Sequence, residues 1–208
     1  MIRRLFEIPK RRFADLLLLG VTSIELIVIF LLTQSFTIVD RIYVLQHLIV
    51  LGIALTRDSP RAWDYSMSSS VAVGVAYIYP YAQVIYLRLS SGYIVSPVAG
   101  LILVTFAAIL SLISLLMMGR AFGVRPALRD LVTTGPYRFV RHPMYLAYFL
   151  ADIGYNLQES NVVTVLFVLV GWVSLVYRIR AEERVLSQHP AWPAYLSLAR
   201  YRIFPGLW

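Results

Sequence analysis

The chain has 208 residues, of which 59% are hydrophobic and only 14% are charged, against roughly 25% charged in a typical soluble domain. Its net charge is +8, and Lys10 is the only lysine. Two uncharged runs, 65–87 and 89–119, each exceed the roughly 20 apolar residues that cross a bilayer as a helix. The composition therefore indicates a polytopic membrane protein and excludes a soluble enzyme, a nucleic-acid-binding domain, a disordered tail and a secreted disulfide scaffold. Because cysteine is absent, a thiolate nucleophile and a cysteine-ligated metal site are also excluded.

The apolar segments predict an all-α protein with about six transmembrane helices. The expected spans are residues 16–36, 42–55, 67–87, 94–118, 143–157 and 162–177. The last two are short and separated by four polar residues, so we expect a tight helical hairpin. The second span is the weakest, and a re-entrant segment is the alternative there. Basic residues at 3–12 can mimic a signal peptide, but the apolar segment after them is too long and has no small-residue cleavage site.

The basic residues predict the orientation of these spans. With a cytoplasmic N-terminus, the cytoplasmic segments are 1–12, 56–66, 119–142 and the tail after Tyr177. These segments contain 17 of the 19 basic residues, and only Arg41 and Arg88 fall outside them. Basic residues concentrate in cytoplasmic segments of membrane proteins. We therefore expect both termini on the cytoplasmic face, together with the polar segments that could carry chemistry.

The segment 133–145 combines turn residues, arginines and the start of a helix. A Gly-Pro pair predicts a turn, and Pro143 suits the first position of the following helix. Arg141 and His142 would then lie at the helix N-terminus, where backbone N–H groups and the helix dipole favour an anion. The alternative is a basic anchor whose tyrosines lie in the interfacial aromatic belt.

A second polar segment, 177–184, directly follows the last span. Arg178 and Glu182 are four residues apart and share one helix face, whereas Glu183 points about 100° away. Two adjacent carboxylates at a membrane surface suit a cation or ribose hydroxyls. The alternative is an ordinary ion pair between Arg178 and Glu182 on a solvated helix.

The C-terminal tail interleaves aromatic residues with Arg200 and Arg202. Its aromatic residues are Trp192, Tyr195, Tyr201, Phe204 and Trp208. This pattern is typical of an amphipathic segment lying on the bilayer, and a lid over the site is a compatible alternative.

Three ionisable residues fall within the expected spans. Glu25, His47 and Asp152 need partners there, but their spacing forms no recognised proton relay. With three scattered histidines and no glycine-rich nucleotide loop, we expect neither a metal site nor a soluble-type nucleotide-binding domain.

Three motifs occur in order along the chain. They are Gly-Pro-Tyr-Arg-Phe-Val-Arg-His-Pro-Met-Tyr at 135–145, Glu182-Glu183 after a hydrophobic hairpin, and Arg-Ile-Phe-Pro at 202–205. This combination resembles the isoprenylcysteine carboxyl methyltransferase family and the related phosphatidylethanolamine and phospholipid methyltransferases. The resemblance covers about residues 119–208, and the first four spans resemble the family only in being hydrophobic. It implies N-terminal membrane spans, 1–118, followed by a catalytic methyltransferase region, 119–208.

The resemblance also implies a cofactor and its site. The family uses S-adenosylmethionine, held at the cytoplasmic face, and takes a lipid substrate from the bilayer. The residues that would contact the cofactor are Leu131, Val132, Tyr137, His142, Pro143, Met144, Tyr145, Glu182 and Glu183. Arg178 falls where the carboxyl methyltransferases place an arginine that faces the substrate carboxylate, so Arg178 and Glu182 are the candidate catalytic residues.

The implied reaction is methyl transfer to a lipid-like acceptor, most directly the carboxylate of an isoprenylcysteine. Methyl transfer from a sulfonium is an in-line displacement that depends on alignment. A carboxylate acceptor is already ionised, and Arg178 would orient it through two hydrogen bonds. An amine acceptor would have to lose a proton, with Glu182 or Glu183 as the nearest base. The alternatives are a lipid amine N-methyltransferase and a non-catalytic membrane protein that retains the fold. The expected partners are the bilayer and a lipophilic or prenylated substrate.

Two departures from the family pattern concern the substrate pocket. The family usually has glycine two residues after the motif tyrosine, where this chain has Ala147. Residues 122–129 match none of the family's upstream segments. The substrate pocket is therefore the least transferable part of the resemblance.

Overall fold

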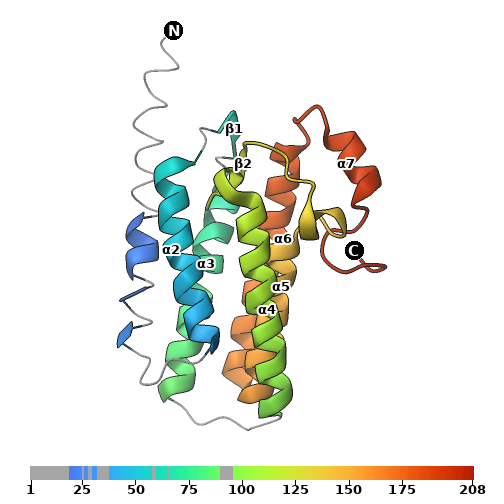
Figure 1. The fold of residues 1–208 in the computed structure, drawn as a ribbon. Helices are drawn as coiled ribbons and strands as arrows, with labels where there is room; N and C mark the ends of the chain where they lie inside the picture. Colours follow the sequence, from blue (N-terminus) through green and yellow to red (C-terminus); the bar gives the residue numbers. More distant parts are fainter. Residues whose placement is uncertain are drawn as a thin grey trace.

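The computed structural model describes residues 19–24, 26–27, 30–31, 38–57, 60–64, 66–89 and 96–208. The long helices are α2 (Ile38–Thr56), α3 (Met67–Leu89), α4 (Pro97–Met118), α5 (Pro143–Gln158) and α6 (Val162–Leu186), which run along one another (Figure 1). The short elements are β1 (Ala62–Trp63), η1 (Gly119–Ala121), β2 (Ala127–Leu128), η2 (Gly135–Arg138) and α7 (Trp192–Leu198). The predicted all-α membrane fold is confirmed. Residues 1–12, Glu25 and most of the first expected span lie outside the described residues.

The five long helices coincide with the last five predicted spans. Pro97 opens α4, where its missing N–H leaves no intrahelical bond unmade. The side chain of Asn161 caps α6 by accepting hydrogen bonds from the N–H groups of Val163 and Thr164, at 2.9 and 3.0 Å. Helix α6 then continues past its predicted end at Tyr177 to Leu186, because residues 178–186 contain no glycine or proline.

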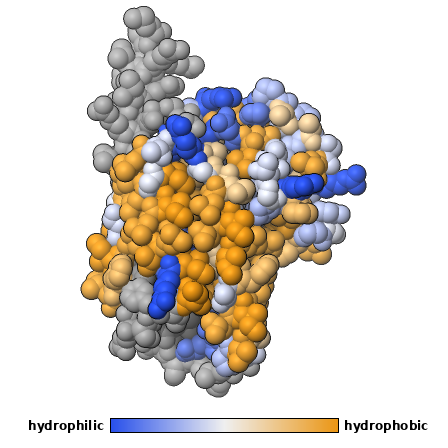
Figure 2. Space-filling model, in the orientation of Figure 1, coloured by the Kyte–Doolittle hydropathy of each residue, from blue (hydrophilic) through white to orange (hydrophobic). Residues whose placement is uncertain are grey.

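The outer surface of the bundle is apolar along much of its length. Figure 2 shows hydrophobic residues covering the long helices, with hydrophilic residues gathered at the end that carries the loops. Exposed large apolar side chains on α4 and α6 include Val98, Ile102, Phe106, Val162, Leu166 and Val173. Among the described helices, three are long and apolar enough to cross a bilayer, namely α2, Pro97–Ala121 and α6. The count of six spans stays a prediction.

Glycines determine which helices pack together. Helix α5 packs mainly along α4, and α6 along α3, so the two helices of the predicted hairpin have other principal partners. A Cβ on Gly100 of α4 would lie 2.5 Å from the carbonyl oxygen of Gly154 on α5. A Cβ on Gly171 of α6 would lie 2.5 Å from the ring of Tyr79 on α3. These close contacts require glycine, and they fix α5 and α6 against different neighbours.

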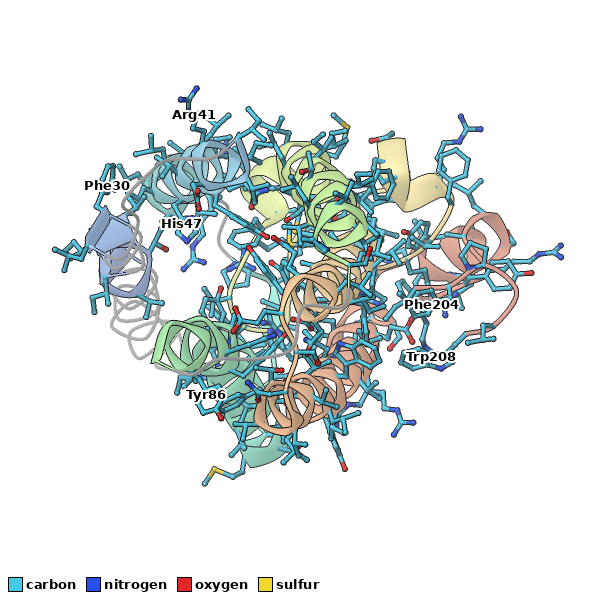
Figure 3. All side chains as sticks on the ribbon, turned by 90° about the horizontal axis from the view of Figure 1, so that it is seen from below. Phe30, Arg41, His47, Tyr86, Phe204 and Trp208 are labelled. Carbon is cyan, nitrogen blue, oxygen red and sulfur yellow. The ribbon has the colours of Figure 1, made fainter. Side chains whose placement is uncertain are left out.

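Helix α2 completes the bundle on the side of α4. The side-chain amide of Gln46 donates to the carbonyl oxygen of Ala108 at 2.9 Å, which joins α2 to α4. Viewed along the bundle, Arg41 points outward from α2, whereas His47 points toward the interior (Figure 3). His47 Nδ1 lies 2.6 Å from the carbonyl oxygen of Tyr43.

Of the segments predicted to share one face, the described parts of 56–66, 119–142 and the tail lie at one end of the bundle (Figure 1). There β1 pairs antiparallel with β2, with Ala62 opposite Leu128. The tail is joined to the central loop, because the N–H of Arg141 donates to Tyr201 O at 2.9 Å and that of His142 to Arg202 O at 2.8 Å. We call this end of the bundle the loop end; its sidedness in the membrane stays a prediction.

Candidate active site

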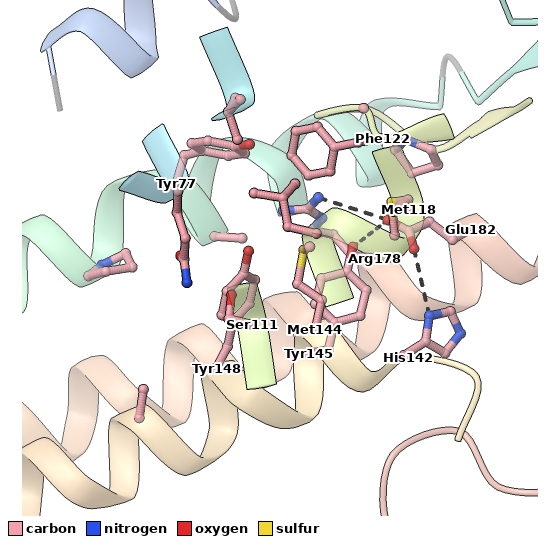
Figure 4. A pocket seen from close by; sticks show the side chains of 18 of the residues that line it. Tyr77, Ser111, Met118, Phe122, His142, Met144, Tyr145, Tyr148, Arg178 and Glu182 are labelled. Atoms are coloured by element: carbon pink, nitrogen blue, oxygen red, sulfur yellow. Dashed lines mark hydrogen bonds and ion pairs between the residues drawn. The ribbon is translucent and has the colours of Figure 1, made fainter. Parts of the chain in front are cut away.

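A cavity of about 640 Å³ lies between the long helices and reaches the loop end. Its walls come from α2, α3, α4, α5 and α6 and from the loop between α4 and α5 (Figure 4). Leu131 and Tyr195 line it at the loop end, and Gln83 and Gln158 line it farther along the bundle. The cavity therefore connects the polar loop end with the interior of the bundle at the level of its apolar surface.

Most of the residues that the resemblance implies as site residues line this one cavity. They are Leu131, Val132, Tyr137, His142, Met144, Tyr145, Arg178 and Glu182. Pro143, which opens α5 and is fully buried, and Glu183 lie outside the lining.

Glu183 faces the tail rather than the cavity. Its carboxylate accepts hydrogen bonds from Nε of Arg141 and Nε of Arg202, each at 2.7 Å, and His142 Nε2 lies 3.4 Å away. Arg141 also donates to the carbonyl oxygens of Ala199 and Arg200, at 2.9 and 2.7 Å. Glu183 points away from Glu182, because consecutive helical residues point about 100° apart, and its place at the cofactor stays a prediction. Glu183 instead fastens the tail and the 135–145 segment to α6.

Glu182 presents its carboxylate to the cavity. The Tyr145 hydroxyl donates to Oε1, Nη2 of Arg178 is 3.9 Å from the same oxygen, and Nδ1 of His142 is 3.7 Å from Oε2 (Figure 4). The side chain remains 21% exposed. A carboxylate held in one orientation and still accessible can accept further hydrogen bonds from a ligand.

Arg178 is buried, so the alternative of an ion pair on a solvated helix is wrong. Its side chain is 8% exposed, and Nη2 donates to the carbonyl oxygen of Val124 at 3.1 Å. The guanidinium carbon lies 5.3 Å from the ring centre of Tyr145 and 5.8 Å from that of Tyr77, within cation–π range. Its buried Nε has no hydrogen-bond partner among the described residues. A buried charged donor without a partner is costly unless a ligand satisfies it.

The start of α5 forms as predicted. Pro143 is its first residue and His142 its N-cap, and the ring of His142 stacks on that of Tyr145 with 5.6 Å between centroids. The preceding turn needs Gly135, whose φ is +57° and whose added Cβ would meet the side chain of Met117 at 2.9 Å. The helix start is thereby placed directly beside Glu182.

Two tyrosines close the loop end of the cavity. The hydroxyl of Tyr195 in α7 donates to the carbonyl oxygen of Tyr137 at 2.9 Å, so the tail contacts the loop there. Burial raises the pKa of Tyr137, and the nearby Glu182 charge raises it further. Burial also raises the pKa of Tyr195. Both hydroxyls therefore stay protonated and act as hydrogen-bond donors.

A further group of cavity residues lies inside the expected spans and is marked by no sequence motif. They are Tyr77, Gln83, Ser111 and Tyr148. Aromatic and small polar residues within an apolar run carry no motif, so only the helix packing reveals them. The structure also supplies the partners that Asp152 needs, because its Oδ2 accepts from Tyr79 Oη at 3.0 Å and Trp172 Nε1 at 2.9 Å.

Residues 98–188 match the model of the isoprenylcysteine carboxyl methyltransferase (ICMT) family. The resemblance seen in the sequence is confirmed. The matched region starts in α4 and ends just after α6, so it contains the loop, the start of α5, Arg178 and Glu182. It also shows that the likeness begins earlier than residue 119, within the fourth predicted span.

The chain is also similar to a protein named protein-S-isoprenylcysteine O-methyltransferase from Schizosaccharomyces pombe (strain 972 / ATCC 24843). The two are 44% identical over 57 residues, which is 27% of this chain and 24% of the relative. The match therefore spans about a quarter of the relative's length.

Proposed function

We propose that this protein is an integral membrane methyltransferase that uses S-adenosylmethionine to methylate the carboxylate of an isoprenylcysteine-like lipid. The observation that carries the proposal is the position of Arg178 and Glu182 on one wall of a cavity that enters the bundle. The family match over residues 98–188 and the name of the yeast relative support the type of reaction.

The loop end of the cavity has the groups that S-adenosylmethionine requires. Leu131 and Val132 offer apolar surface to the adenine, and the accessible Glu182 carboxylate suits the ribose hydroxyls. The N–H groups of Met144 and Tyr145, in the first turn of α5, suit the methionyl carboxylate. When bound, this cofactor supplies an electrophilic methyl group on a sulfonium. The chain's contribution is to hold both reactants in line and to exclude water.

Arg178 is the residue that favours a carboxylate acceptor. Its Nε is buried without a partner among the described residues, and the same guanidinium lies within 3.9 Å of Glu182. An acceptor carboxylate that takes hydrogen bonds from Arg178 would therefore lie next to whatever Glu182 holds. It is already ionised, so the transfer needs no general base. An ammonium acceptor would instead meet a buried positive charge that repels it.

The rest of the cavity suits the hydrophobic part of such an acceptor. It continues from Arg178 past Tyr148 into the bundle, at the level where the outer surface is apolar. A lipid chain can lie there while its polar end stays at the loop end, so the substrate need not leave the hydrocarbon environment completely.

The test is methyl transfer by the purified protein in lipid vesicles, with the methyl group of S-adenosylmethionine labelled. The acceptors offered are prenylcysteine analogues with a free carboxylate, the same analogues as amides, and amine lipids. We expect label only in the free carboxylates. Transfer to amine lipids alone, or to none of the acceptors, would contradict the proposal.

A further inference from the structure

The cavity contains a polar side chain that lies far from the proposed reaction centre and has no protein partner. Gln83 on α3 is 3% exposed and lines the cavity, yet its amide Nε2 has no hydrogen-bond partner among the described residues. A buried amide donor without a partner destabilises a protein, so its presence needs an explanation. The Gln83 amide would be satisfied by a ligand group that accepts a hydrogen bond at this position in the cavity.

Asp152 on α5 lines the same cavity. Both hydrogen bonds that its carboxyl accepts from described residues, from Tyr79 and Trp172, end on Oδ2, so Oδ1 keeps its acceptor capacity. Tyr79 lies on α3 one turn before Gln83, so the two share a helix face. The Tyr79–Asp152 hydrogen bond therefore brings Asp152 and Gln83 to neighbouring positions on the cavity wall.

We propose that Gln83 and Asp152 form a second polar subsite that binds a hydroxyl group on the apolar part of the lipid acceptor. A hydroxyl is the group that matches both partners, because it accepts from the Gln83 amide and donates to the Asp152 carboxyl. A purely hydrocarbon chain would leave the Gln83 amide without an acceptor and Asp152 Oδ1 without a donor. The identity of the ligand as the methyl acceptor rests on the proposed function, whereas the subsite itself rests on the geometry of Gln83 and Asp152.

The helix geometry gives the position of this hydroxyl along the ligand. Tyr145 lies beside Glu182, and Asp152 is seven residues farther along α5. At 1.5 Å per residue, the subsite is roughly 10 Å from the proposed reaction centre. The acceptor should therefore carry its hydroxyl roughly 10 Å from its carboxylate.

Equilibrium binding to the purified protein in detergent tests the subsite without requiring turnover. The probes are N-acetyl-S-dodecylcysteine and two analogues, one with a hydroxyl roughly 10 Å from the carboxylate and one with the hydroxyl at the chain end. We expect the first analogue to bind about tenfold more tightly than either of the others. Equal binding of the three probes by the wild-type protein would overturn the proposal, whether or not any variant folds.

Two leucine substitutions add a matched comparison. Gln83→Leu should abolish the preference for the hydroxylated probe and should not lower thermal stability, because it removes an unpartnered amide. Gln46→Leu is the control, since Gln46 lines the same cavity but its amide is already bonded to Ala108. It should retain the preference. A preference that persists in Gln83→Leu would assign the unpartnered amide to bound water and overturn the subsite.

Methyl transfer to the same probes separates this proposal from the previous one. If the hydroxylated probe binds preferentially but no probe is methylated, the proposed function fails and the subsite stands. If the probes are methylated but bind equally, the subsite fails and the proposed function stands.

Discussion

Arg178 is the residue on which the proposed acceptor chemistry depends. Lysine carries the same charge but cannot form the two parallel hydrogen bonds of a guanidinium. We expect Arg178→Lys to lower kcat/KM for a prenylcysteine analogue by about tenfold to a hundredfold. Affinity for S-adenosylmethionine should stay within about twofold, because Glu182 and the start of α5 remain.

Arg180 offers a matched control on the same helix. It is exposed and lies beside a different surface hollow, on the side of α6 that holds Glu183. Arg180→Lys should therefore leave both turnover and cofactor affinity unchanged. Full activity in Arg178→Lys and in Arg178→Ala would remove the carboxylate role of Arg178.

Glu182 and Glu183 are adjacent but should respond differently to loss of charge. Glu182→Gln should weaken cofactor binding by roughly tenfold to a hundredfold, as expected for losing a charge-assisted hydrogen bond. Glu183→Gln should leave cofactor affinity unchanged but lower thermal stability, because Arg141 and Arg202 lose their shared carboxylate. Calorimetric titration with the demethylated cofactor and thermal denaturation measure the two effects. Reduced affinity in Glu183→Gln alone would reverse this assignment.

Sequence spacing predicted the relation between Arg178 and Glu182 but not the surroundings of either. The four-residue interval fixes a shared helix face wherever the helix lies. Whether that face meets water or a cavity depends on α3 and α5, which are distant in sequence. The same is true of Gln83 and Asp152. Each is a single polar residue in an apolar run, and only the packing of the helices shows that it lines the cavity.

At the scale of the elements, the contact between α4 and α5 holds the site in place. A Cβ on Gly100 would approach Gly154 O to 2.5 Å, and backbone atoms cannot move aside as a flexible side chain can. Gly100→Ala should therefore separate the two helices and lower thermal stability by several degrees. Cofactor binding should weaken too, because α5 begins at the site.

Gly74 on α3 is the matched control for this substitution. No described atom outside its own helix backbone lies within 4 Å of a Cβ added there. Gly74→Ala should be neutral or stabilising, by up to about 1 kcal/mol, because alanine favours the helical state. Equal stability of Gly100→Ala and Gly74→Ala would contradict the close packing of α4 against α5.

Helix positions were predictable from apolar length and capping residues, but helix partners were not. Asn161 and Pro97 mark helix starts by local chemistry. The choice of α4 for α5 and of α3 for α6 depends on Gly100, Gly154 and Gly171, whose sequence context resembles that of other glycines in apolar runs. The short connection between α5 and α6 predicts that they are neighbours, but it does not predict which other helix each of them mainly packs against.

At the scale of the whole molecule, orientation in the membrane is the open prediction. The wild type contains no cysteine, so single cysteines can be labelled without background. Ser160→Cys lies between α5 and α6. It should react with a membrane-impermeant thiol reagent only when the reagent is on the non-cytoplasmic side of the membrane. Ser187→Cys, after α6 at the loop end, should react only from the cytoplasmic side.

The opposite labelling pattern would mean that the protein is oriented the other way in the membrane, with the loop end on the non-cytoplasmic side. Labelling of both positions from one side would mean that α6, which lies between them, does not cross the membrane. Either result would conflict with the 17 basic residues that the prediction places on the cytoplasmic side.

Methyl ester formation on a lipid carboxylate can be measured directly. Purified protein in vesicles is given S-adenosylmethionine with a tritiated methyl group and a prenylcysteine analogue, and the recovered lipid is treated with mild base. A methyl ester releases its label as volatile methanol, whereas an N-methyl amine keeps it. We predict that nearly all of the transferred label becomes volatile. Label that remains on the lipid after base, or no transfer at all, would contradict the account.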